Sequence, residues 1–130
     1  TNVFTTASQA LETGTGVCQD HAHIFIACCR QLNVPSRYVS GYLFTERGDL
    51  LESHAWAESW IDQKGWVSMD VANCKMTNGR HVRLAVGLDY RDACPVSGIR
   101  VGGGQESMSV GVDVSQLSTL SINQMQQSQQ

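Results

Sequence analysis

Cys18, His54 and Asp70 are the three residues whose types and order could support thiol chemistry. A nucleophilic thiol needs a lowered pKa, a base that holds its proton and donors for the oxyanion that forms on a substrate carbonyl. Cys18 follows Gly14-Thr15-Gly16-Val17 at the predicted start of a helix. The helix dipole and the free N–H groups of the first turn stabilise a thiolate and an oxyanion there. The sequence therefore predicts a nucleophile at Cys18.

His54 and Asp70 are predicted to be the partners of this thiol. His54 opens the segment 53–61, in which polar and aromatic residues alternate with small ones, as in a strand. Asp70 lies in the segment 66–71, which follows a turn and predicts the second strand of a β-hairpin. A carboxylate beside the imidazole would fix its tautomer and stabilise the imidazolium of a thiolate–imidazolium pair.

The hairpin loop decides whether these two side chains can meet. His54 and Asp70 share a face only if paired residue numbers sum to an even value, which requires an odd number of loop residues. A three-residue loop at 62–64 would pair Ile61 with Gly65 and place Asp70 diagonal to His54. We expect a loop of three or five residues, or an equivalent bulge, with Gly65 relieving the strain.

Other candidate groups have simpler explanations. The spacing of Cys18, His21, His23 and Cys28 does not converge on one point of a helix, so no metal site is expected. His21 and His23 are predicted on the helix surface with Asp20 as a partner, and His81 is expected at the surface. Cys28 and Cys29 lie in an apolar run and are interpreted as structural. The triple glycine at 102–104 lacks the context of a phosphate loop, and no cofactor is predicted.

The elements that must position these residues follow from periodicity and turn signals. The predicted elements are a short helix from about 5 to Gly14, a buried helix from Cys18 to 31 that stops before Pro35, and strands at 37–44, 53–61, 66–71, 80–88 and 108–114. A turn is expected at 46–49. The tail 115–130 is rich in Gln and is predicted to be disordered.

Composition limits the classes of function. The chain has 130 residues, 42% hydrophobic and 16% charged, with a net charge of −3. Such a chain forms one small core and carries no basic field for nucleic acid. The longest apolar run, 24–29, is far shorter than a membrane span. Five cysteines, an odd number, favour free thiols in a reducing compartment, so we expect a cytoplasmic protein with no membrane or nucleic-acid partner.

Five blocks of the sequence, in order, resemble the bacterial transglutaminase-like superfamily, a group of cysteine proteases with a papain-like core. They are Gly14-Thr15-Gly16-Val17-Cys18-Gln19-Asp20-His21-Ala22-His23, 35–42, Ser53-His54-Ala55-Trp56, Gly65-Trp66-Val67-Ser68-Met69-Asp70, and Arg80-His81-Val82-Arg83 with Gly87-Leu88-Asp89-Tyr90. The resemblance implies an α+β fold in which the Cys18 helix packs on an antiparallel sheet. It also implies a catalytic domain over 1–114 in an N-terminally truncated member that lacks the region supplying a second oxyanion donor.

By this resemblance Cys18 is the nucleophile, His54 the general base and Asp70 the orienting acid. The predicted activity is acyl transfer on amide bonds, with hydrolysis of a peptide or protein substrate favoured. Transamidation and a non-catalytic binding module are the alternatives. Gly16, Val17 and Trp56 are the predicted residues of the substrate groove. The sequence does not indicate the oligomeric state.

Overall fold

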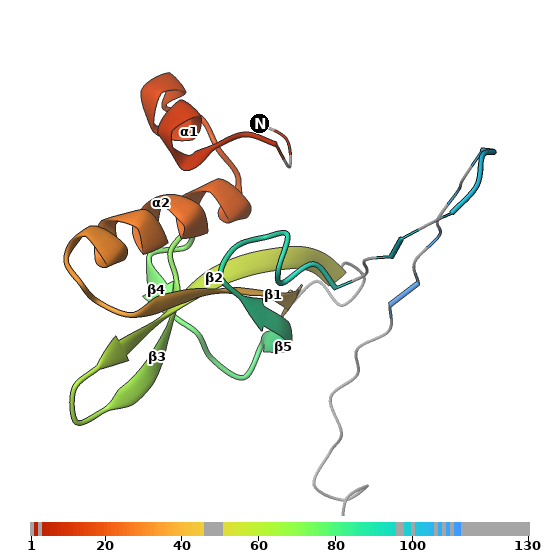
Figure 1. Cartoon of the computed structure of the whole chain (residues 1–130). Helices are drawn as coiled ribbons and strands as arrows, with labels where there is room; N and C mark the ends of the chain where they lie inside the picture. The colour runs from red at the N-terminus through yellow and green to blue at the C-terminus, as the bar shows by residue number, and fades with distance from the viewer. Residues whose placement is uncertain are drawn as a thin grey trace, which may run out of the picture.

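The computed structural model describes residues 2, 4–45, 51–95, 98–99, 101–105, 107, 109 and 111–112. Two helices are followed by five strands (Figure 1). The helices are α1 (Ala7–Thr13) and α2 (Cys18–Gln31). The strands are β1 (Ser36–Phe44), β2 (Leu51–Ile61), β3 (Gly65–Asp70), β4 (Lys75–Met76) and β5 (His81–Gly87).

Both helices have the ends that the sequence indicates. Thr6 caps α1 by accepting from the Gln9 N–H, and Gly14 ends the helix with a left-handed φ of 63°. The second helix begins at Cys18, as predicted. Its first turn is fixed by Asp20, whose Oδ2 accepts from the Val17 N–H at 2.9 Å. The carboxylate also complements the positive end of the helix dipole.

The strands form one antiparallel sheet in the order β4-β3-β2-β1-β5. The loop at 62–64 has three residues and pairs Ile61 with Gly65, which confirms the predicted register. Gln63 and Gly65 have φ values of 68° and 81° and so provide the reversal. Since Ala57 pairs with Met69, the even-numbered residues of both strands share one face.

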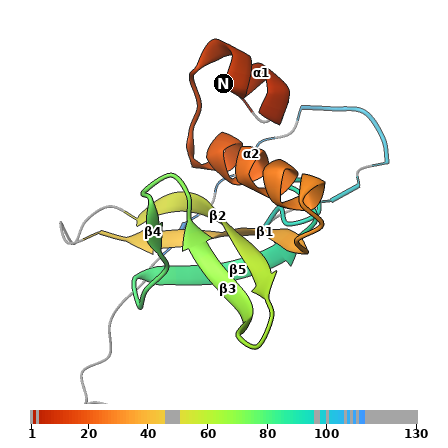
Figure 2. The same ribbon diagram turned by 90° about the vertical axis from the view of Figure 1, so that its left-hand side faces the viewer.

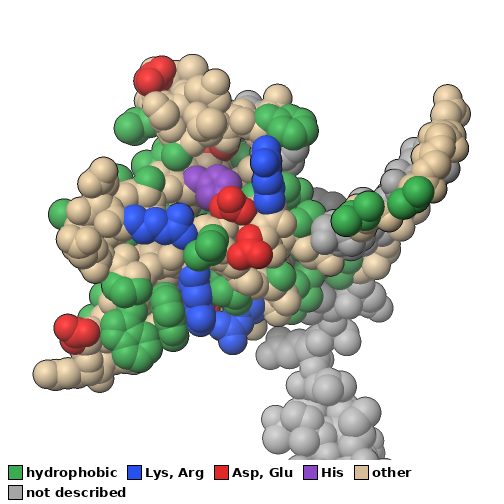
Figure 3. All heavy atoms as spheres, in the orientation of Figure 1, with side chains coloured by type: hydrophobic (Ala, Val, Ile, Leu, Met, Phe, Trp, Pro, Cys, Tyr) green, Lys and Arg blue, Asp and Glu red, His purple; other side chains and the backbone are tan. Residues whose placement is uncertain are grey.

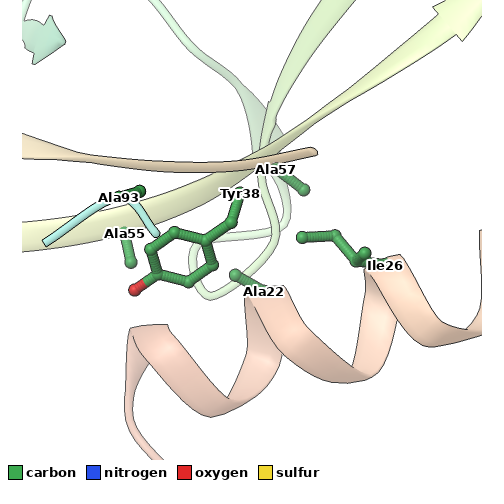
Figure 4. Packing of buried hydrophobic residues seen from close by; sticks show 6 residues of the cluster. All are labelled: Ala22, Ile26, Tyr38, Ala55, Ala57 and Ala93. Atoms are coloured by element: carbon green, nitrogen blue, oxygen red, sulfur yellow. The ribbon is translucent and has the colours of Figure 1, made fainter. Parts of the chain in front are cut away.

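α2 covers one face of the sheet, α1 packs on α2, and the core lies between that face and α2 (Figure 2). Tyr38 is the largest residue of this core, and its ring lies between the sheet and the helix residues Ala22 and Ile26 (Figure 4). Alanines from β2 and the chain after β5 complete it: Ala55, Ala57 and Ala93. Small residues here let the helix approach the strands closely.

Some of the predicted elements cannot be compared with the described residues, and one observed strand was not predicted. The expected turn at 46–49, most of the strand at 108–114 and the tail 115–130 lie outside the described residues. The two-residue strand β4 was not predicted, because so short a segment carries no periodicity. Neither described helix has the length and hydrophobicity needed to cross a membrane.

Candidate active site

Cys18 lies where the first turn of α2 meets an open edge of β2. The thiol is half-buried and accepts a hydrogen bond from the backbone N–H of Ala55. The last described pair between β2 and β3 is Ala57 with Met69, and β3 ends one residue later at Asp70. The Ala55 N–H is therefore available to the thiol rather than to a neighbouring strand.

His54 lies between the thiol and a buried carboxylate. Its Nε2 is 2.9 Å from Oδ1 of Asp70, and the two side chains are 9% and 0% exposed. The same imidazole forms a hydrogen bond with Cys18. Because Nε2 faces Asp70, Nδ1 is the nitrogen left to face the sulfur. The structure thus brings together the three residues that the sequence singles out.

The surroundings of Cys18 favour its thiolate. Burial alone would raise the pKa of the Cys18 thiol, but the hydrogen bond with His54 opposes it most strongly. Hydrogen bonds from the N–H groups of Ala55 and Gln19 act in the same direction, so the pKa falls below its ordinary value. Each of these donors binds the charged form of the sulfur better than the neutral form.

The imidazole of His54 is shifted in the complementary direction. The hydrogen bond with Cys18 raises the pKa of His54 most, burial lowers it, and contact with Asp70 raises it further. The net effect is a pKa above the ordinary value for histidine. The lowered pKa of the thiol and the raised pKa of the imidazole together favour a thiolate–imidazolium pair.

Asp70 is held by more donors than His54 alone. Burial would raise the pKa of its carboxyl group, but hydrogen bonds from His81, Asn73 and His54 lower it to about 2. The Asn73 Nδ2 donates to Oδ2 at 2.8 Å. The carboxylate is therefore ionised at neutral pH and fully enclosed.

His81 is the residue of this site that the sequence prediction misplaced. Its side chain is 2% exposed, and its Nε2 lies 2.9 Å from Oδ2 of Asp70, so the expected surface position is wrong. The alternation of β5 does not reveal this contact, because His81 begins the strand at the far edge of the sheet. Its nearness to Asp70 follows from the pairing of Gly41 with His54 and of Leu43 with His81, which places both histidines on one face of the sheet.

The predicted groove residues occupy different environments. Gly16 and Val17 are exposed beside Cys18, and Val17 is 57% exposed. Trp56 is 2% exposed, and its ring packs edge-on against His81 with centroids 5.4 Å apart. Its ring centroid is 6.2 Å from that of His54. Trp56 thus supports the two imidazole rings from within the protein.

The remaining histidines and cysteines have other surroundings. His23 is half-buried, stacks on Tyr38 at 4.8 Å and accepts from the Tyr90 N–H. Asp20 bonds to the backbone of Val17 rather than to a histidine side chain. All five cysteines carry reduced thiols, and Cys28 is exposed rather than packed in the core.

Comparison with known proteins gives concordant matches. The model of the transglutaminase-like superfamily matches residues 2–71, more than half of the chain. The chain is 37% identical to an uncharacterized protein of Mycobacterium leprae over 123 residues, covering 90% of this chain and 43% of that protein. It is 31% identical to a protein-glutamine gamma-glutamyltransferase of Pseudomonas aeruginosa over 104 residues, covering 71% of this chain and 16% of that one.

A solved structure supports the same assignment. The crystal structure of a putative cysteine protease from Cytophaga hutchinsonii matches with a TM-score of 0.63 and 35% identity, covering 72% of this chain and 31% of that chain. The chain spans less than half the length of these relatives. Both the fold and the sequence match therefore place this chain in the transglutaminase-like superfamily.

Proposed function

We propose that the domain catalyses thiol-dependent acyl transfer on amide bonds, with Cys18 as nucleophile, His54 as general acid–base and Asp70 as the orienting carboxylate. One observation carries the proposal. The Cys18 sulfur has hydrogen bonds with His54 and with the Ala55 N–H, while His54 is 2.9 Å from a fully buried carboxylate. That arrangement supplies an activated nucleophile and a proton donor in one place.

The reaction begins with attack of the Cys18 thiolate on an amide carbon. The C–S bond forms, and the carbonyl oxygen becomes an oxyanion that first-turn N–H groups of α2 can bind. The imidazolium of His54 then donates its proton to the leaving nitrogen, the C–N bond breaks and a thioester remains. Water, deprotonated by His54, attacks the thioester and releases a carboxylic acid and the thiol. We favour hydrolysis of a peptide or protein substrate as the outcome.

Transamidation is the second candidate. A primary amine that reaches the thioester before water would leave with the acyl group as a new amide. The 31% identity to a protein-glutamine gamma-glutamyltransferase is the observation that favours it. The same three residues serve both outcomes, so the acceptor that enters the site decides between them.

A non-catalytic binding module with the same fold is the alternative from another class. Such a module would need no acidic thiol, so the reactivity of Cys18 discriminates between the two. Cys28, an exposed thiol on the same helix, provides an internal reference within every sample.

The experiment measures alkylation of each cysteine by iodoacetamide between pH 4 and pH 9, located by mass spectrometry, in wild type and His54→Ala. An ordinary thiol has a pKa of about 8.5, and paired catalytic thiols fall to about 3.5–7.5. We expect Cys18 to react at pH 6 at least about tenfold faster than Cys28, and to lose that advantage in His54→Ala. Equal rates for the two cysteines in wild type would refute the proposal.

Substrate assays then separate the two catalytic outcomes. A glutamine-containing peptide is incubated with and without a primary amine, and the products are weighed by mass spectrometry. A free acid in the presence of the amine supports hydrolysis, whereas an amine adduct supports transamidation. Cys18→Ser serves as the blank for both reactions.

A further inference from the structure

The oxygen of Asp70 that faces away from His54 is occupied by a second histidine. His81 Nε2 lies 2.9 Å from Oδ2, opposite the Oδ1 that contacts His54. Both the His81 and Asp70 side chains are essentially without solvent exposure. The acyl-transfer scheme above gives His81 no task, so the buried contact requires its own explanation.

The hydrogen bonds of His81 fix which ring nitrogen carries the proton. Its Nδ1 accepts from the backbone N–H of Asn78 at 3.1 Å, and a nitrogen that accepts carries no hydrogen. Oδ1 of Asn78 also lies 3.2 Å from Nδ1, but it accepts from the Arg80 N–H at 3.0 Å, and the shorter contact of Nδ1 is with a backbone N–H that can only donate. The hydrogen of the neutral imidazole is therefore on Nε2, where it donates to Asp70.

This tautomer indicates that His54, Asp70 and His81 form a chain of hydrogen bonds, which we call the relay, rather than a metal site. One ligand atom from each of His54, Asp70 and His81 lies within 4.8 Å of the others, and these residue types also bind divalent metals. A ligating imidazole presents a bare nitrogen to the metal and donates its other N–H to a neighbour. His81 has the reverse arrangement, because its outer nitrogen accepts from a backbone N–H.

The ring of His81 is held in place by packing as well. Trp56 contacts it edge-on at 5.4 Å, and the Trp56 ring occupies the space beside Gly41. A Cβ at Gly41 would lie 2.8 Å from that ring and would also meet the Val82 carbonyl oxygen. The glycine thus leaves room for the indole that positions His81.

We propose that His81 is a positioning residue, which holds the Asp70 carboxylate toward His54 by donating from a fixed neutral tautomer. The inference rests on the proposed function, since it concerns how the base of that reaction is oriented. Without this donor, Oδ2 would lose one of its two side-chain partners inside the protein and the carboxylate could rotate. His54 would then lose part of its ion pair, and the thiolate–imidazolium pair would be less stable.

The test compares two substitutions. His81→Phe keeps a ring against Trp56 but removes the donor, whereas His81→Gln places an amide N–H near the position of Nε2. The readout is the pH profile of Cys18 alkylation, which needs no knowledge of the substrate. We expect the acid limb to move up by about one pH unit in His81→Phe, with a rate at pH 6 about tenfold lower. His81→Gln should stay within about twofold of wild type.

His21→Phe is the matched control, because it replaces a half-buried histidine of α2 that lies outside the relay. An unchanged profile in a folded His81→Phe protein would overturn the inference, as would equal losses in His81→Phe and His81→Gln. If wild-type Cys18 is no more reactive than Cys28, the proposed function fails instead. The two failures are therefore distinguishable.

A measurement on the wild-type protein covers the case in which His81→Phe does not fold. Two-bond ¹⁵N–¹H correlation spectra distinguish the two nitrogens of each imidazole. We expect His81 at pH 7 to show a protonated Nε2 and an unprotonated Nδ1. A protonated Nδ1 would overturn the inference without any substitution.

Discussion

At the scale of single residues, the Asp70 carboxylate connects the parts of the candidate site. One oxygen faces His54, and the other accepts from His81 and from the Asn73 side chain. Burial alone would favour the neutral acid, so the donors around it keep the negative charge in place. This charge adds to the hydrogen bond with Cys18 in raising the pKa of His54.

Replacing that charge should disable the thiol. In Asp70→Asn the group facing His54 is neutral, and an amide cannot stabilise an imidazolium as a carboxylate does. We expect alkylation of Cys18 at pH 6 and amide hydrolysis to fall by at least about 100-fold. Asp62→Asn, in the exposed hairpin loop, is the control and should match wild type. Wild-type reactivity in Asp70→Asn would exclude the carboxylate from the mechanism.

The same carboxylate should make stability depend on acid pH. The pKa of Asp70 is about 2 in the folded protein against an ordinary value of 3.8. Because the folded value is depressed, its contribution is complete well above pH 4 and is lost as the pH falls toward 2. Between pH 6 and pH 2, we expect the free energy of unfolding of wild type to fall by about 2 kcal/mol more than that of Asp70→Asn, as measured by urea denaturation. Parallel losses would contradict the assignment.

At the scale of elements, the β2–β3 hairpin shows what sequence can predict. The requirement that His54 and Asp70 share a face predicts a loop with an odd number of residues, and the observed three-residue loop at 62–64 meets it, because a one-residue shift would exchange the two faces of β3. The bounds of α2 follow equally from its apolar spacing and from Pro35. Local patterns therefore carry the positions of Cys18, His54 and Asp70.

The contact of His81 with Asp70 could not be predicted in the same way. It depends on β5 pairing with β1 at the far edge of the sheet, with a register shift between Ser40 and Gly41. It also depends on the loop that carries Asn78. Long-range pairing and loop paths leave no periodic signal, so a histidine at a strand start looks like a surface residue.

The hairpin makes a prediction about Gly65. Its φ of 81° lies in the left-handed region, where a side chain costs about 1–2 kcal/mol, although a Cβ would meet the Trp60 ring only at an ordinary 3.7 Å. We expect Gly65→Ala to be destabilised by that amount in urea denaturation. Gly79→Ala should cost less, because Gly79 has no positive φ and open space around it. Equal costs would mean that the backbone at Gly65 is not strained.

At the scale of the whole molecule, a buried acid links several strands on the sheet face opposite α2. Glu58 on β2 is 3% exposed, accepts from Ser68 of β3 at 2.7 Å and pairs with arginines of β1 and β5. Arg37 also stacks on the Trp66 ring at 3.9 Å, beside the hydrophobic side chains that gather over the β2–β3 hairpin (Figure 3). Four strands thus meet at one carboxylate.

Removing the charge of Glu58 should therefore weaken the entire sheet. Glu58→Gln leaves Arg37 and Arg83 without their anionic partner, and we expect a loss of about 2 kcal/mol in the free energy of unfolding. Glu52→Gln, an exposed change on the same strand, should have a far smaller effect. If both variants unfold at the same urea concentration, the network contributes nothing measurable to stability.

The hydrogen bonds of Asp70 also tie together the two ends of the segment between β3 and β5. Asn73 binds the carboxylate at the beginning of this segment and His81 binds it at the end, so residues 70–81 form a ring fastened without a covalent bond. Lys75 and Arg80 lie exposed within the ring and are sites for trypsin. Loss of the carboxylate would open the ring, so Asp70 variants should become sensitive to proteolysis there even while the rest of the sheet remains intact.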